Sequence, residues 1–125
     1  LINALIAFGM IENAEGVLEE IITTSNVNKA LDPNLEPFHQ VLKAWSDAGE
    51  PRRVESLVLL MEELKDRARL ANIKPTSETY NILLRAWARS KLRQAGERTD
   101  LILREMASRG VSITLHSYNF ALTAW

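Results

Sequence analysis

The chain has no cysteine among its 125 residues. This absence excludes a disulfide framework, a thiol nucleophile and a cysteine-ligated zinc site within the sequence. The chain also lacks an apolar run of the roughly 18 residues that a membrane-spanning helix needs, so we expect no membrane contact. No signal or transit segment is recognisable. Because the sequence begins inside one helical pattern and ends on another, we interpret it as part of a longer protein.

Neither sign of charge is in excess. The 15 Lys and Arg residues are matched by 16 Asp and Glu residues, for a formal net charge of −1. A strongly basic nucleic-acid binder is therefore not indicated by bulk charge. The charges are unevenly distributed, however: residues 1–40 carry one basic and six acidic side chains, whereas residues 41–125 carry 14 basic and 10 acidic ones. Any site for a polyanion is expected in the second part.

Catalytic motifs are missing as well. The sequence contains no phosphate-binding loop, no G-x-S-x-G and no Gly-rich dinucleotide fingerprint. His39 and His116 are 77 residues apart, with no H-E-x-x-H motif and no third ligand, so no metal site is predicted. We expect no enzymatic activity, no cofactor and no small-molecule substrate in this stretch. An enzyme would need a catalytic domain outside it.

What the sequence does contain is one amphipathic helical stripe, repeated. The stripe places apolar residues at i, i+3, i+4 and i+7. Its copies are Phe38, Val41, Leu42 and Trp45, then Tyr80, Leu83, Leu84 and Trp87, then Tyr118, Ala121, Leu122 and Trp125, with a truncated copy at Leu1, Ile2 and Leu5. The alanines Ala4, Ala44, Ala86 and Ala124 recur at spacings of 40, 42 and 38 residues. A period of about 40 residues is typical of a solenoid of stacked helical units.

Proline and glycine residues divide the chain into helical hairpins. We predict helices over residues 1–8, 11–23, 37–48, 51–71, 78–90, 92–108 and from 115 onward, and a loop over 24–34. No segment alternates with period two, so the predicted fold is all-α. Its units are a partial repeat at 1–34, a repeat with an extended second helix at 35–76, a repeat at 77–114, and the first helix of a further repeat at 115–125.

The repeated stripe predicts which side chains form the core. Three tryptophans at one equivalent position in an apolar stripe favour a buried core over platforms on which bases stack. In the helix 92–108, we expect Leu92, Ala95, Ile102, Leu103 and Met106 to face inward. Gly96 lies inside that helix, and we expect its small size to let the paired helices approach closely.

The residues around this stripe resemble the pentatricopeptide repeat. The resemblance rests on Thr79-Tyr80-Asn81-Ile82-Leu83-Leu84, Ala86, Glu105-Met106, Gly110-Val111 and Ser117-Tyr118-Asn119. The tetratricopeptide repeat fits less well, because its Trp opens the helix and is followed by L-G. The resemblance implies a right-handed α-solenoid that binds single-stranded RNA in mitochondria or plastids. Members of the family act in RNA stability, processing, editing or translation.

The resemblance also implies which residues read bases. In the family, each repeat reads one base through a few side chains on its concave face. Carried over to this sequence, the reader pairs are His39 with Thr76 and Asn81 with Thr114, while Asn119 and Asn34 each belong to a pair with one member outside the sequence. An Asn amide carries both a donor and an acceptor, which suits a base edge. The alternative is that these are only polar first-turn residues.

Basic side chains on the first helices are candidate phosphate contacts. They are Lys43, Arg85 and Arg89, and the alternative is an ordinary solvated helix face. Glu36 and Glu78, together with the near-zero net charge, motivate a second hypothesis. In that hypothesis the chain is a structural or protein-binding scaffold of a large organellar ribonucleoprotein, without base-specific RNA readout.

Overall fold

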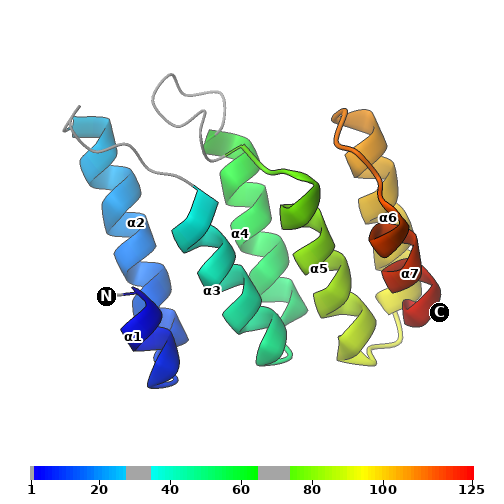
Figure 1. The fold of residues 1–125 in the computed structure, drawn as a ribbon, viewed down its shortest axis with the longest axis horizontal. Helices are drawn as coiled ribbons and strands as arrows, with labels where there is room; N and C mark the ends of the chain where they lie inside the picture. The colour runs from blue at the N-terminus through cyan, green and yellow to red at the C-terminus, as the bar shows by residue number, and fades with distance from the viewer. Residues whose placement is uncertain (1, 28–34, 65–73) are drawn as a thin grey trace.

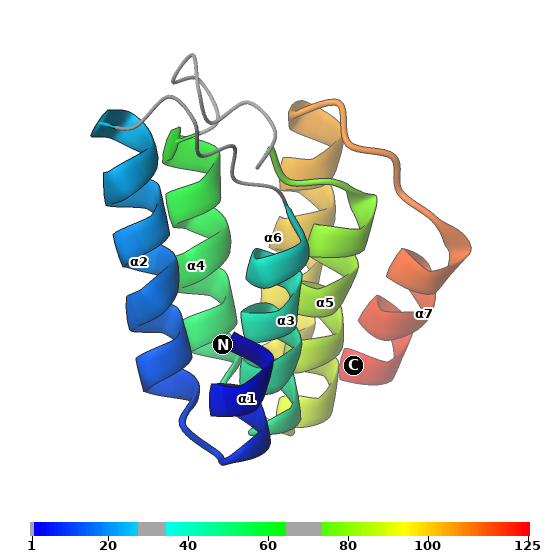
Figure 2. The ribbon, with the colours of Figure 1, turned by 60° about the vertical axis from the view of Figure 1, so that its left-hand side comes forward.

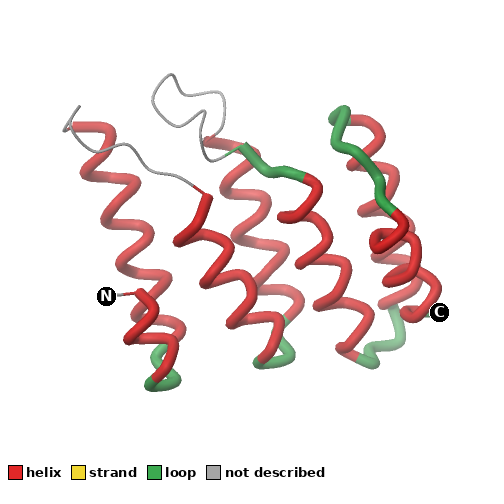
Figure 3. The backbone as a smooth tube through the Cα atoms, viewed as in Figure 1, coloured by secondary structure: helices red, strands yellow, loops and turns green. Residues whose placement is uncertain are grey.

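The computed structural model describes residues 2–27, 35–64 and 74–125. These ranges contain helices and loops and no strand, as Figure 3 shows. The helices are α1 (Ile2–Ala7), α2 (Ile11–Val27), α3 (Leu35–Asp47), α4 (Pro51–Leu64), α5 (Ser77–Ser90), α6 (Ala95–Ser108) and α7 (Leu115–Ala124). They follow one another along a single stack (Figure 1). The all-α prediction is confirmed.

The stack has two layers. Figure 2 shows α3, α5 and α7 on one side and α2, α4 and α6 on the other. Consecutive first helices (α1, α3, α5, α7) contact one another, and each second helix contacts the first helices of its own and the next hairpin. Within the described ranges, consecutive second helices do not approach within 8 Å between Cα atoms. Because the first helices lie closer together than the second helices, they form the inner, concave layer of a helical-repeat solenoid.

The repeated apolar stripe lies between the two layers. Phe38, Tyr80 and Trp87 are fully buried, and Trp45 is 6% exposed. The guanidinium of Arg53 lies 4.6 Å from the centre of the Trp45 ring, and that of Arg98 lies 5.7 Å from the Trp87 ring. Each buried indole is thus covered by a cation from the second helix of its own hairpin. The prediction that Trp45 and Trp87 belong to the core is confirmed.

The third copy of the stripe does not share this environment. Trp125 is 71% exposed and Leu122 is 74% exposed, whereas Ala121 is buried. The prediction that Trp125 is a core residue is therefore wrong in this structure. The reason is that α7 packs on α5 and α6, and no described second helix covers its other side.

Gly96 makes room for a different neighbour than expected. A Cβ atom at this position would lie only 2.6 Å from Cε3 of Trp125, and all its nearest neighbours belong to that indole. The small residue therefore admits Trp125, the residue that follows α7, which is a neighbour that the prediction did not name.

Several helix ends also differ from the prediction. Helix α2 continues to Val27, so residues 24–27 are helical and not part of a loop. Helix α5 ends at Ser90, and Lys91 follows it in a left-handed conformation with φ 58°. Helix α6 begins only at Ala95 and not at residue 92 as predicted. Leu92 consequently lies in the turn and is 40% exposed, so its predicted inward position is wrong. The predicted helix beyond Leu64 and the loop at 28–34 lie outside the described residues.

Glycine residues follow α3 and α6, close to the predicted ends of the helices at residues 48 and 108. Gly49 follows α3 with φ 77°, and Gly110 follows α6 with φ 71°. An L side chain rarely adopts these angles, whereas glycine does so at no steric cost. The cap at Gly49 is directly followed by α4, which begins at Pro51 as predicted. Tight turns of this kind keep the two helices of a hairpin side by side.

Tyr80 connects its own helix to two others. Its hydroxyl donates to Glu62 Oε1 of α4 at 2.7 Å and accepts from Arg109 Nη1, at the end of α6, at 2.7 Å. Arg109 Nε also lies 3.7 Å from Glu62 Oε2. Burial raises the pKa of Tyr80 far above its usual range, and the hydrogen bond to Glu62 raises it further, so the phenol remains a donor. The network links α4, α5 and α6.

Replacing Tyr80 by phenylalanine is expected to destabilise the fold by about 1–3 kcal/mol, because the partly buried Glu62 and Arg109 lose a hydrogen-bond partner. Urea denaturation followed by circular dichroism measures this difference. Tyr118→Phe is the matched control, since Tyr118 has the same place in the next stripe but is 52% exposed. Its effect should stay within about 0.5 kcal/mol. Equal decreases in the free energy of unfolding for Tyr80→Phe and Tyr118→Phe would contradict the structural role of the network.

Candidate functional site

The first helices leave one polar face open to solvent. We call this the inner polar face. It follows a helical spacing of three or four residues on each helix. Its residues are Glu36, Gln40, Lys43 and Asp47 of α3, Glu78, Asn81, Arg85 and Arg89 of α5, and Asn119 and Thr123 of α7. The face arises because the apolar stripe on the opposite side of each helix turns toward the second helices.

Asn81 and Thr114 lie together at the boundary between α5 and α7. Asn81 Nδ2 donates to Thr114 Oγ1 at 3.3 Å, and Ser117 Oγ donates to Asn81 Oδ1 at 2.6 Å. Thr114 is the N-cap of α7 and Ser117 is the third residue of that helix, and the two form a reciprocal capping box. The structure therefore brings the predicted reader pair together, with Ser117 as a third member. Contact of the pair with a base stays a prediction.

His39 makes the equivalent contact one repeat earlier. Its Nε2 lies 2.8 Å from Oγ1 of Thr79, the third residue of α5, whose N-cap is Thr76. Its Nδ1 lies 3.7 Å from Glu78 Oε2. We call these contacts the inter-repeat clasps: His39 with Thr79 between α3 and α5, and Asn81 with Ser117 and Thr114 between α5 and α7. Thr76 meets His39 only through Thr79.

The clasp at His39 is buried. The residue is 7% exposed, and burial lowers the pKa of its imidazole below the usual value, although the nearby Glu78 carboxylate acts in the opposite direction. Lys43 lowers this pKa further, and Glu36 raises it. The neutral form of the ring is therefore favoured in the folded protein. Little of its surface remains for a ligand on the inner polar face.

Sequence reasoning missed Thr79 and Ser117. Both are fully buried hydroxyl residues, and both lie three positions after a threonine N-cap. The signal was available as T-x-x-T at residues 76–79 and T-x-x-S at residues 114–117. It has the spacing of a capping box, with a hydroxyl in place of the usual Glu or Gln. What it could not show is that the same hydroxyls bond the preceding first helix.

The basic residues of the face form cross-helix ion pairs. Lys43 Nζ lies 3.6 Å from Glu78 Oε1, and Arg85 and Arg89 lie 3.5 Å and 3.6 Å from Asp47 Oδ1. All these pairs join α3 to α5. The Lys43 and Arg89 side chains are 52% and 55% exposed, and such exposed pairs contribute only about 0–1 kcal/mol each. The cations are therefore held in place and remain accessible to an anion.

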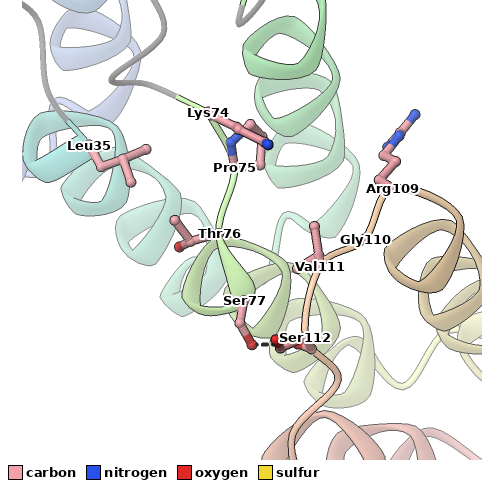
Figure 4. Close-up of a pocket in the computed structure, with 9 residues that line it drawn as sticks. All are labelled: Leu35, Lys74, Pro75, Thr76, Ser77, Arg109, Gly110, Val111 and Ser112. Carbon is pink, nitrogen blue, oxygen red and sulfur yellow. Dashed lines mark hydrogen bonds between the residues drawn. The ribbon is translucent and has the colours of Figure 1, made fainter.

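Three predicted site residues remain to be placed: Asn119, Thr76 and Asn34. Asn119 is exposed on α7 at the position equivalent to Asn81. Thr76 lines an open groove of about 420 Å³ between the loops before α5 and α7 (Figure 4), where Ser77 Oγ donates to the Ser112 carbonyl at 2.8 Å. Asn34 lies outside the described residues.

In residues 2–27, 35–64 and 74–125, no three or more His, Cys, Asp or Glu side chains lie close enough together to hold a metal ion. No helix in those ranges has the length and apolar character that crossing a bilayer requires.

The stacked hairpins and their inner polar face define a helical-repeat protein. No family profile matches the chain. It is 26% identical over 125 residues to a pentatricopeptide repeat-containing protein of Arabidopsis thaliana, a match that covers 98% of this chain and 20% of that protein. The chain thus spans about a fifth of the length of the curated relative. This whole-length match confirms the resemblance to the pentatricopeptide repeat family.

The lowered pKa of His39 predicts a pH-dependent stability. Because the unfolded chain binds a proton on His39 more readily than the folded chain, stability contributed by this residue is lost as the pH falls below about 6.5. Thermal unfolding between about pH 7.5 and pH 5 should therefore show a steeper loss for the wild type than for His39→Asn. Asparagine is the residue that occupies the equivalent place at Asn81.

His116→Asn is the matched control, since His116 is exposed on α7. It is expected to keep the wild-type dependence on pH. An identical pH dependence for wild type and His39→Asn would show that the imidazole does not stay neutral in the clasp.

Proposed function

We propose that the chain is a segment that binds single-stranded RNA along the inner polar face of α3, α5 and α7. The observation that carries the proposal is the hydrogen bond between Asn81, at the start of one repeat, and Thr114, at its end. Arg85 and Arg89 lie on the same helix and are accessible from the same face. The resemblance to the pentatricopeptide repeat supports it. From the same resemblance we propose that the protein acts in RNA stability, processing or translation in mitochondria or plastids.

In this proposal phosphates and bases meet different residues. The backbone phosphates contact Lys43, Arg85 and Arg89, whose partners on the face are exposed carboxylates that an anion can displace. Bases contact the amides of Asn81 and Asn119, each of which has a donor and an acceptor. Thr76, Thr114 and Asn34 complete the reader pairs, and His39 takes part mainly by positioning α5.

The charge on the face sets the expected strength of binding. The cations at 43, 85 and 89 are opposed by Glu36, Asp47 and Glu78, so the face is formally neutral. Because counterion release from a single strand contributes a slope of about 0.7 per phosphate contact, three contacts give a slope near 2 at most. We therefore propose moderate affinity, with a large share from base contacts.

A second candidate function is a structural or protein-binding scaffold of a ribonucleoprotein. It is favoured by one observation: the cations of the face are paired with its own carboxylates, and the inter-repeat clasps engage His39 and Asn81. Such a face needs no ligand to complete it. On this reading, partner proteins stay bound after ribonuclease treatment, and the chain shows no salt-dependent affinity for RNA.

Arg85→Ala separates the two candidates. In fluorescence anisotropy with a randomised single-stranded RNA, the substitution should weaken binding and reduce the slope of log K against log salt concentration by about 0.7, because one phosphate contact is lost. Arg104→Ala, on the exposed surface of α6, is the matched control and should leave the slope unchanged. Affinity that is independent of salt, or equal effects of the two substitutions, would favour the scaffold.

A further inference from the structure

The side-chain amide of Asn81 is engaged on the edge that would pair with a base. Its Oδ1 accepts from Ser117 Oγ at 2.6 Å while its Nδ2 donates to Thr114 Oγ1 at 3.3 Å. The two hydroxyl oxygens are 3.1 Å apart. Ser117 thus supplies a donor and Thr114 an acceptor, side by side. The edge of a base presents the same pair of groups to an asparagine amide.

The two hydroxyls are fixed by the start of α7. Thr114 N–H donates to Ser117 Oγ at 3.1 Å, and Ser117 N–H donates to Thr114 Oγ1 at 3.3 Å. Ser117 is fully buried, so its hydroxyl has few other positions available. The capping box thus presents a rigid partner to Asn81, and the contact does not depend on a mobile side chain.

The donor and the acceptor that remain free on the Asn81 amide cannot both bond to the same base. A primary amide has a second lone pair on its oxygen and a second N–H on its nitrogen. In a planar carboxamide these point to opposite sides once the shared edge is occupied. A single base can then reach one of them but not both, so two-point recognition requires the clasp to open.

The same arrangement recurs at the preceding boundary. His39 Nε2 lies 2.8 Å from the hydroxyl of Thr79, which is the third residue of α5 and part of a capping box with Thr76. Since Thr79 and Ser117 occupy equivalent positions, the clasp is a repeated feature of this stack. The residue three positions after the helix N-cap takes the same role at both boundaries.

We propose that Ser117 is a positioning residue that decides whether Asn81 can read a base. Its hydroxyl occupies the acceptor on the Asn81 edge that would pair with a base. Asn81 can make both hydrogen bonds to a base only in the fraction of molecules in which this contact is broken. The apparent affinity is reduced by that fraction. This inference rests on the proposed binding of RNA to the inner polar face.

The test measures RNA binding by Ser117 variants. Ser117→Ala should tighten binding of the randomised single-stranded RNA by about fivefold, the factor that corresponds to one hydrogen bond of ordinary net strength. Asn81→Ala should then weaken binding more in the Ser117→Ala background than in the wild type, as a double-mutant cycle shows. Ser117→Thr keeps the hydroxyl, as Thr79 does one repeat earlier, and is expected to behave as the wild type.

A structural readout accompanies the affinities. Exchange of the Asn81 side-chain amide protons, followed by NMR, should be faster in Ser117→Ala than in the wild type and unchanged in Ser117→Thr. Circular dichroism establishes that each variant is folded. If Ser117→Ala does not fold, Ser117→Cys replaces it, since a thiol is a weak donor and should give an intermediate gain in affinity.

Two results would overturn the inference in distinguishable ways. If RNA binds but Ser117→Ala leaves its affinity unchanged, and Asn81→Ala costs the same in both backgrounds, Ser117 has no such role while the proposed function stands. If neither the wild type nor any variant binds RNA, the proposed function fails and the inference fails with it.

Discussion

Burial of the first-helix stripe between two second helices is the contact on which the rest of this structure depends. Helix α5 shows it in full: Tyr80 and Trp87 are completely buried, with α4 on one side and α6 on the other. Helix α7 has α6 on one side only, and Trp125 is accordingly 71% exposed. The apolar stripe of a first helix is therefore buried completely only when the second helices of its own and of the preceding hairpin both cover it. Stability thus depends on contacts between neighbouring repeats, as in other repeat proteins.

This packing also determines what the inner layer presents. Because the apolar stripe faces the second helices, the polar side of each first helix faces the concave surface, and consecutive first helices lie close enough to bond one another. Asn81 therefore lies on the inner polar face and within reach of the next first helix, whereas His39 makes the equivalent contact while buried. The candidate site and the joint between repeats share residues, so any change in one affects the other.

Polar contacts in the two layers differ in strength for a simple reason. The network of Tyr80, Glu62 and Arg109 is centred on a fully buried tyrosine and a carboxylate whose side chain is 8% exposed, so the loss of one member removes a partner from each of the others. The pairs that Asp47 makes with Arg85 and Arg89 are exposed, and water can replace them at low cost. The network around Tyr80 stabilises the stack. The ion pairs of Asp47 are weak enough for Arg85 and Arg89 to exchange the carboxylate for another anion.

The sequence by itself determined the features that depend on local spacing. The helical hairpins, the glycine caps at Gly49 and Gly110 and the burial of Trp45 and Trp87 follow from the local spacing of residues. The period of about 40 residues follows from the repetition of that spacing along the chain. Of the candidate site, the family resemblance paired Asn81 with Thr114, but their hydrogen bond was not predicted. Only the tertiary structure decided that Gly96 admits Trp125 and that Thr79 and Ser117 bond the preceding first helix. Those outcomes depend on how adjacent helices dock, which no pattern within a single helix records.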